Sequence, residues 1–205
     1  MKFVLFVEGH TEKQALGYFL KRWLDPRLDS HVGFQVVRFD GWSDLVKETP
    51  KKARMYLNRK DIIGVISLLD LYGPTIYPDD KTTAGSRYNW AKSDLEKRVN
   101  DQNYRQFFAV HETEAWLLSD PDIFPPAIRQ ALPGKTQHPE TVNFDEPPSK
   151  LLQRLYKEKI KRTYKKVTHG KALFDRLDPA IAYKKCPYLR ELFDEMLKLA
   201  RKAGL

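Results

Sequence analysis

Runs of consecutive apolar residues alternate, in the first half of the chain, with segments whose apolar residues recur at helical spacing. The apolar runs have the length of strands and lie at residues 2–7, 33–39, 61–70 and 105–111. The first and third runs are almost entirely apolar, which is typical of strands covered on both faces. Strands that alternate with helical segments predict an α/β fold with a parallel sheet.

Helical spacing is clear in residues 11–24, where Thr11 is expected to cap the helix. A second helix is predicted over residues 43–57, with a kink or break at Pro50. Residues 71–88 are rich in Gly, Pro, Thr and Asp and predict a long loop, a feature that is usually functional or mobile in a compact domain. Shorter helices are predicted at residues 89–99 and 113–120, the second with Thr113 as its cap.

The length of 205 residues suits one domain with an appended subdomain, which we place at residues 1–145 and 146–205. No apolar run approaches the roughly 20 residues of a membrane-spanning helix, and no signal-peptide cleavage site follows the first apolar run. A single cysteine, Cys186, excludes an intramolecular disulfide and a cysteine-rich metal site. We therefore expect a cytoplasmic protein with no membrane partner.

Positive charge is concentrated in the C-terminal segment. Residues 146–205 contain 16 Lys and Arg against 7 Asp and Glu, whereas residues 1–145 contain 20 of each kind. A localised basic surface predicts a phosphate-rich partner, here nucleic acid, with DNA favoured over RNA; the alternative is a solvated helix face. The residues expected to contact nucleic acid are Lys157, Lys159, Lys161, Arg162, Lys165, Lys166, His169 and Lys171.

Acidic residues follow three of the four predicted strands. Glu8 follows the first and Asp70 ends the third, while the fourth leads into His111, Glu112 and Glu114. Because ligands of an open parallel sheet bind at the carboxyl ends of its strands, we expect these groups to meet. Clustered carboxylates repel one another unless a cation joins them, and oxygen ligands suit Mg²⁺ or Mn²⁺.

Each of these residues also has a structural interpretation. Glu8 can be a turn acid, Asp70 can brace the loop that follows it, and Glu114 can be a first-turn acid favoured by the helix dipole. Glu12, in the first turn of the first helix, is expected to be such a structural acid that faces the site. The sequence contains no phosphate-binding Gly-rich loop, no His pair with zinc-ligand spacing and no serine nucleophile motif.

The motifs "VEGHTE" (7–12), "DLYG" (70–73) and "HETEAWLLSD" (111–120) together resemble a family of prokaryotic TOPRIM-like proteins, domain of unknown function 4276. The segments "PPSKLL" (147–152) and 168–189 also fit that family. The resemblance implies a Rossmann-like, TOPRIM-type three-layer sandwich with a mostly parallel four-stranded sheet and a basic helical C-terminal extension. The TOPRIM domain is shared by topoisomerases, primases and overcoming-lysogenization-defect type nucleases.

Carried over by position, the resemblance assigns general acid–base or metal-binding chemistry to Glu8 and metal binding to Asp70. The second aspartate of the TOPRIM Asp-x-Asp pair is replaced by Tyr72, which removes a metal ligand. Glu112 and Glu114 are the expected substitutes, and His111 is expected to orient a ligand or contact phosphate. The resemblance further implies a nuclease effector in a phage-defence setting, with an ATPase encoded beside it.

The leading hypothesis is therefore a Mg²⁺- or Mn²⁺-dependent nuclease or related phosphodiester-cleaving enzyme. A non-catalytic TOPRIM-like module that binds nucleic acid or a partner ATPase is the second hypothesis, favoured by Tyr72. A metal-dependent phosphatase or nucleotide hydrolase, with residues 71–88 as a lid, is the third.

Overall fold

The computed structural model describes the whole chain except residues 142–145 and the side chain of Lys135. Its strands are β1 (Lys2–Val7), β2 (Gly33–Arg38), β3 (Ile62–Asp70) and β4 (Tyr104–Ala109). Its α-helices are α1 (His10–Leu24), α2 (Trp42–Leu57), α3 (Ala84–Val99), α4 (Glu114–Leu117), α5 (Pro126–Arg129), α6 (Pro148–Ile160), α7 (Lys166–Arg176), α8 (Pro179–Lys185) and α9 (Pro187–Lys202). Short 3₁₀ helices are η1 (Asp25–Arg27), η2 (Pro121–Ile123), η3 (Gly134–Gln137) and η4 (Pro139–Thr141).

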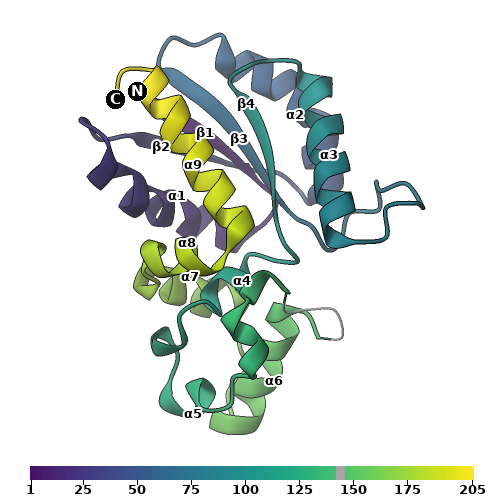
Figure 1. The fold of residues 1–205 in the computed structure, drawn as a ribbon, viewed down its shortest axis with the longest axis vertical. Helices are drawn as coiled ribbons and strands as arrows, with labels where there is room; N and C mark the ends of the chain where they lie inside the picture. Colours follow the sequence, from purple (N-terminus) through teal and green to yellow (C-terminus); the bar gives the residue numbers. More distant parts are fainter. Residues whose placement is uncertain (142–145) are drawn as a thin grey trace.

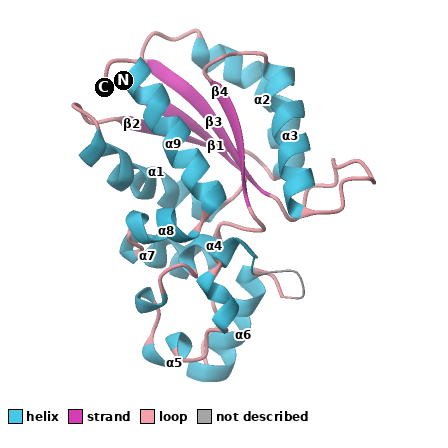
Figure 2. Cartoon of the chain, viewed as in Figure 1, coloured by secondary structure: helices cyan, strands magenta, loops and turns pink. Residues whose placement is uncertain are grey.

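The four strands form one sheet in the order β2-β1-β3-β4, and every pair of neighbours is parallel. Helices α1 and α9 cover one face of the sheet, and α2 and α3 cover the other (Figure 1, Figure 2). This arrangement confirms the predicted three-layer α/β fold with its four-stranded parallel sheet. Asp70 pairs with Ala109 in the register of β3 and β4, so the chain leaves both strands at the same edge of the sheet.

Two hydrophobic cores lie on the two faces of the sheet because side chains alternate along each strand. On β1, Phe3 and Leu5 belong to the core beneath α1 and α9, whereas Val4 and Phe6 belong to the core beneath α2 and α3. Every one of these four side chains is fully buried. The sheet is thus covered on both faces, as its continuous apolar strands predict.

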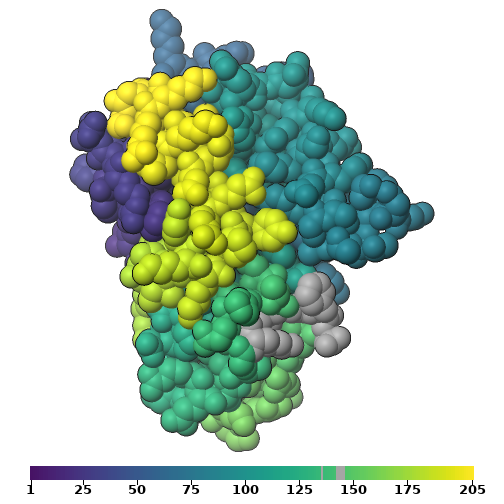
Figure 3. Space-filling model, viewed as in Figure 1, coloured from purple at the N-terminus to yellow at the C-terminus, as the bar shows by residue number. Residues whose placement is uncertain are grey.

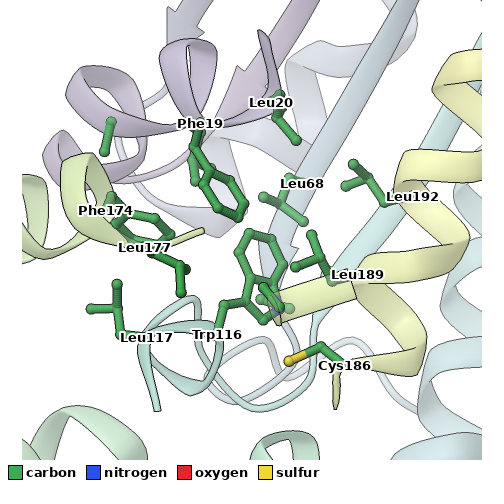
Figure 4. Close-up of a cluster of buried hydrophobic side chains, with 14 of the residues drawn as sticks. Phe19, Leu20, Leu68, Trp116, Leu117, Phe174, Leu177, Cys186, Leu189 and Leu192 are labelled. Atoms are coloured by element: carbon green, nitrogen blue, oxygen red, sulfur yellow. The ribbon is translucent and has the colours of Figure 1, made fainter. Parts of the chain in front are cut away.

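The first of these cores continues beyond the sheet into the C-terminal helices. The ring of Trp116, a residue of α4, lies within 6.5 Å, between ring centroids, of Phe19 from α1 and Phe174 from α7. Leu189 and the thiol of Cys186, at the start of α9, complete the same cluster (Figure 4). Cys186 is buried and, as the single cysteine of the sequence, forms no intramolecular disulfide.

Helices α4 to α8 gather beyond one end of the sheet, and α9 returns along the sheet (Figure 1). Figure 3 shows these C-terminal helices as a surface continuous with the sheet layers. The predicted boundary between residues 1–145 and 146–205 falls at a segment outside the described residues. In the described part of the chain, no helix is long and apolar enough to cross a membrane.

Three local predictions differ from the structure. Helix α1 begins at His10 with Gly9 as its N-cap, so Thr11 lies inside the helix and does not cap it. Pro50 does not break the predicted helix, because α2 runs without interruption from Trp42 to Leu57. Leu45 and Ala53, which are buried on either side of Pro50, offset the loss of one N–H group. The predicted loop is shorter than expected, because Thr83 and Ser86 form a capping box that starts α3 at Ala84.

Candidate functional site

Acidic side chains meet at the carboxyl ends of β1 and β3, where they face a pocket of about 320 Å³. Glu8 directly follows β1, Asp70 ends β3, and Glu12 comes from the first turn of α1. All three line the pocket, together with Lys166 from the first turn of α7. The structure therefore brings together two of the predicted acids, one expected structural acid and one lysine predicted to contact nucleic acid.

Asp70 is held in place by the chain that follows β4. The backbone N–H of Thr113 donates to Oδ1 of Asp70 at 3.0 Å, and the Thr113 hydroxyl donates to Oε1 of Glu12 at the same distance. Thr113 is 1% exposed and makes no capping bond to α4 with its side chain. Its donors instead fix two carboxylates from different elements relative to each other.

Glu12 also packs tightly against the turn after β1. A Cβ atom added at Gly9 would overlap Oε2 of Glu12, so a larger residue at this position would displace the Glu12 carboxylate. Glu12 is 5% exposed. In the short "EGHTE" segment, Glu8 and Glu12 therefore line the same pocket, and Gly9 leaves the space that the Glu12 carboxylate occupies.

Lys166 reaches into the acidic group from the opposite side. Its Nζ lies 3.1 Å from Oε2 of Glu114 and 3.7 Å from Oδ2 of Asp70. Glu114 is the first residue of α4 and is fully buried, so its carboxylate lies behind the pocket wall. Lys166 thus links the predicted acids of β3 and α4, and it does not lie on the outer face with most of the other basic residues.

Burial and mutual repulsion decide the charge of these groups. Burial raises the pKa of Asp70 well above its usual range; the charge of Lys166 opposes this, and nearby acids raise the pKa further. Burial also raises the pKa of Glu114, to about 7, and that of Glu8. Burial disfavours the charged form of Lys166, but Asp70 and Glu114 outweigh it and raise the pKa of the lysine. The lysine stays charged at neutral pH, and the acids around it favour a further positive charge.

Glu112, the remaining acid predicted for the site, binds the start of α6. Glu112 does not line the pocket, and its two oxygens accept hydrogen bonds from the backbone N–H and the hydroxyl of Ser149, at 2.8 and 2.9 Å. Ser149 lies in the first turn of α6, where N–H groups lack partners within the helix. Glu112 therefore anchors α6, and Glu12 stands in the pocket where Glu112 was predicted.

His111 forms the turn between β4 and α4. Its φ of 42° is in the left-handed region, which is unusual for a residue with a side chain. The side chain is 5% exposed, and burial lowers its pKa. The backbone carbonyl accepts from the N–H of Tyr72 at 3.1 Å. This strained turn directs Thr113 towards Asp70, and Tyr72 itself, 59% exposed, does not line the pocket.

Five of the predicted nucleic-acid contacts are exposed and lie between the second half of α6 and the start of α7; we call them the α6–α7 basic surface: Lys157, Lys159, Lys161, Arg162 and Lys165. Three of these residues, Lys157, Lys161 and Arg162, line a groove of about 760 Å³ along the end of α6. Helix α6 lies at the end of the molecule opposite the two termini (Figure 1). The basic surface and the acidic pocket are joined by the short segment that leads into α7.

His169 and Lys171 have local partners. Nδ1 of His169 accepts from the backbone N–H of Lys165 at 2.7 Å, and its ring stacks on Tyr164 at 5.7 Å between centroids. The ammonium of Lys171 lies 2.6 Å from Asp175, one turn later in α7. Both residues thus stabilise α7 and its entry, and a nucleic-acid contact by either one stays a prediction.

The oxygen-only set of side chains fits a hard divalent cation in its chemistry. Oε1 of Glu114 is buried and has no hydrogen-bond partner among the described residues, which agrees with a site that has more acceptors than donors. The geometry is less complete, because among those residues no group of three His, Cys, Asp or Glu side chains converges on one ion position. Glu8, Glu12 and Asp70 are the residues that would hold a cation facing the pocket.

A comparison with known families decides where the chain belongs. The model of the family described as "Domain of unknown function (DUF4276)" matches residues 7–197. The chain belongs to this family. No curated protein matches its sequence. The C-terminal region of the Burkholderia pseudomallei OLD protein has a similar fold, with a TM-score of 0.50 and 16% identity over 97% of this chain and 98% of that one.

Two residues of this DUF4276 chain matter to the pocket in a way that the sequence did not predict. Thr113 was expected to cap a helix, whereas it binds Asp70 and Glu12. Gly170 was not predicted to matter, although a Cβ there would lie 2.9 Å from Cγ2 of Thr11, so α7 touches α1 at this point. Gly170 lies one turn after Lys166, and a glycine in an otherwise helical segment was the available signal for this close contact.

Proposed function

We propose that the chain is a divalent-metal-dependent nuclease, or a related enzyme that cleaves phosphodiester bonds in nucleic acid. The observation that carries this proposal is the group of acids at the carboxyl ends of β1 and β3, with Lys166 among them. Its support is threefold: a surplus of carboxylates, an open pocket and an adjoining basic surface. The fold shared with the OLD protein's C-terminal region agrees with this proposal.

The roles follow from the positions of the side chains. Asp70 and Glu12 are the rigid acids of the pocket, because Thr113 donates a hydrogen bond to each of them. Glu8 is only partly buried and has a raised pKa, so it is suited to carry a proton to or from the reacting oxygens. Lys166 supplies a positive charge next to the position of a phosphate. A bound Mg²⁺ or Mn²⁺ would neutralise charge on the phosphate and lower the pKa of attacking water.

The test is a cleavage assay with plasmid, linear and single-stranded DNA and with RNA, in EDTA, Mg²⁺ or Mn²⁺. We expect cleavage in the presence of a metal, with DNA preferred to RNA. Asp70→Asn and Glu8→Gln should each lower the rate by about 10²–10⁴-fold, the size of effect found for acid–base and electrostatic groups. Glu112→Gln is the matched control, because that carboxylate binds Ser149 and should leave the rate within a few-fold of the original.

A non-catalytic module that binds nucleic acid is the second candidate. The observation in its favour is the ion pairing of Lys166, which already neutralises part of the charge on Asp70 and Glu114. Retained binding of nucleic acid without cleavage in any metal would support this candidate and contradict the nuclease. A partner ATPase and a role in phage defence stay predictions of the family resemblance.

A further inference from the structure

The acidic pocket has one fixed cation for several carboxylates. Asp70 is influenced by the charges of Glu8, Glu12 and Glu114, and Lys166 is the neighbouring cation that opposes them. Among the described residues, Lys166 is also the only lysine or arginine that lines the pocket. A cluster of this kind needs positive charge from elsewhere, because buried carboxylates are stable as anions only when they are paired.

Lys166 lies where a bridging cation would lie. Its Nζ is 3.1 Å from Glu114 and 3.7 Å from Asp70, so one ammonium group is shared between carboxylates from two elements. Glu114 has no other ion pair in the described part of the chain, and its second oxygen, Oε1, has no hydrogen-bond donor there. The ammonium therefore supplies the positive charge that holds α4 and β3 together.

The position of Lys166 is set by close packing. Helix α7 approaches α1 closely because Gly170 has no side chain, and a Cβ there would lie 2.9 Å from Thr11 and 3.4 Å from the hydroxyl of Tyr164. Lys166 lies four residues before Gly170 and so projects from the same face of α7. Thr11 lines the pocket beside Glu12. The contact that brings α7 onto α1 therefore also directs Lys166 into the acids.

We propose that Lys166 is a built-in cation that occupies the position between Asp70 and Glu114, so that a divalent ion binds only at the Glu8 and Glu12 end of the pocket. Without Lys166, the position between Asp70 and Glu114 would bind a second divalent ion. Tyr72, two residues after Asp70, does not line the pocket and so adds no ligand for a second ion there. The inference rests on the metal dependence of the proposed function.

The test counts bound Mn²⁺ per chain, by isothermal titration calorimetry and by the electron paramagnetic resonance signal of unbound Mn²⁺. The original protein should bind one Mn²⁺ at this site, and Lys166→Met should bind one more. Lys165→Met is the matched control, because it removes the neighbouring exposed lysine and should not change the number. Lys166→Arg keeps the charge and should also leave the number unchanged.

An equal number of Mn²⁺ ions in the original protein and in Lys166→Met would overturn the inference. Lys166→Gln replaces Lys166→Met if circular dichroism shows that the methionine variant is unfolded. Anomalous diffraction from Mn²⁺-soaked crystals of the original protein gives an answer that needs no variant: one peak beside Glu8 and Glu12 supports the inference, and a peak between Asp70 and Glu114 contradicts it. Failure of the proposed function has a different signature, namely bound Mn²⁺ without cleavage of any nucleic acid.

Discussion

The acidic pocket and the α6–α7 basic surface use charge in opposite ways. Around the pocket, carboxylates from the turn after β1, from α1 and from β3, with that of Glu114 behind them, are partly or fully removed from water, and Thr113 donates to two of them. On the basic surface, side chains such as Lys157 and Arg162 are exposed, and water and salt ions screen them. Lys165 and Lys166 show the contrast between neighbours, since the first is exposed and the second reaches Glu114.

This difference separates the expected contributions of the two regions. A buried charge changes pKa values and stability, because it interacts strongly through a medium of low polarity. An exposed charge contributes little to stability and acts mainly on the binding of a charged partner and on its salt dependence. The pocket should therefore control chemistry and folding, and the basic surface should control affinity.

The largest effect is expected on nucleic-acid binding. A variant with Lys157, Lys159, Lys161 and Arg162 all changed to Gln should bind DNA about 10²–10³-fold more weakly at 0.15 M salt. Each cation that is lost makes one contact fewer with a phosphate, so fewer counterions are released from the DNA on binding. The slope of log affinity against log salt concentration should become shallower by up to about 3.6. Fluorescence anisotropy in EDTA measures both, and an unchanged slope would show that this surface does not bind nucleic acid.

The next effect concerns Glu140, a buried acid that lines neither the acidic pocket nor the groove beside α6. Glu140 is 5% exposed and accepts from the backbone N–H groups of Tyr188 and Leu189 at the start of α9, at 2.8 and 3.1 Å. Burial nevertheless raises its pKa from 4.5 to about 7. The folded protein therefore holds a proton that the unfolded chain releases, and this residue makes stability fall as the pH rises from about 4.5 to 7.

Urea denaturation at a series of pH values measures this contribution, which should amount to about 3 kcal/mol at most. Glu140→Gln should remove that part of the pH dependence, because a neutral amide can still accept one of the N–H bonds. Glu158→Gln is the control, since Glu158 is exposed on α6 beside Arg154. A pH profile unchanged by Glu140→Gln would mean that the carboxyl group titrates as it does in water.

The sequence pattern predicted the sheet well because the pattern is local. The four apolar runs became β1 to β4 with ends within two residues of the predicted ones, and the acids Glu8 and Asp70 were placed at one edge by the general geometry of parallel sheets. Such inferences need only the periodicity of side chains and the direction of the strands. They do not depend on the packing of distant segments.

The partners of those acids were harder to predict, because packing between distant segments decides them. Lys166 is separated from Asp70 by 96 residues in sequence, and nothing in "YKKVTHGK" distinguishes it from Lys165. Glu112 and Glu114 are equally acidic, yet one anchors α6 and the other is buried behind the pocket. The close contact at Gly170 and the packing of Phe174 on Phe19 set which face of α7 meets α1.

That contact gives a third, smaller prediction. Gly170→Ala adds a Cβ atom 2.9 Å from Cγ2 of Thr11, and overpacking of this kind should lower stability by about 1–2 kcal/mol even though alanine favours a helix. Gly85→Ala is the control, because a Cβ atom at Gly85 in α3 would make only an ordinary contact, at 3.6 Å from the Tyr188 hydroxyl. This variant should make the protein slightly more stable, since alanine favours a helix more than glycine does.

A double variant tests the origin of this loss. Thr11→Ser removes the methyl group that the new Cβ would meet, so Gly170→Ala combined with Thr11→Ser should recover most of the stability lost by Gly170→Ala alone. Thermal denaturation followed by circular dichroism measures the cycle. Purely additive losses would mean that the α1–α7 contact relaxes elsewhere and does not fix Lys166.

The smallest effect tests whether the basic surface matters to stability at all. Lys161 ends α6 with a φ of 55°, a left-handed conformation that costs a residue with a side chain about 1 kcal/mol and costs glycine little. Lys161→Gly should therefore raise the free energy of unfolding by about 0.5–1 kcal/mol. Lys157→Gly removes an equal charge from the helix interior and should lower it by about 1 kcal/mol.

Because both variants lose one exposed lysine, the opposite signs would assign the effect to the backbone conformation and not to charge. Both should weaken DNA binding to a similar extent, since each removes one cation from the same groove. Equal losses of stability would instead show that charge on this surface stabilises the fold. In that case the contrast between the pocket and the basic surface would have to be abandoned.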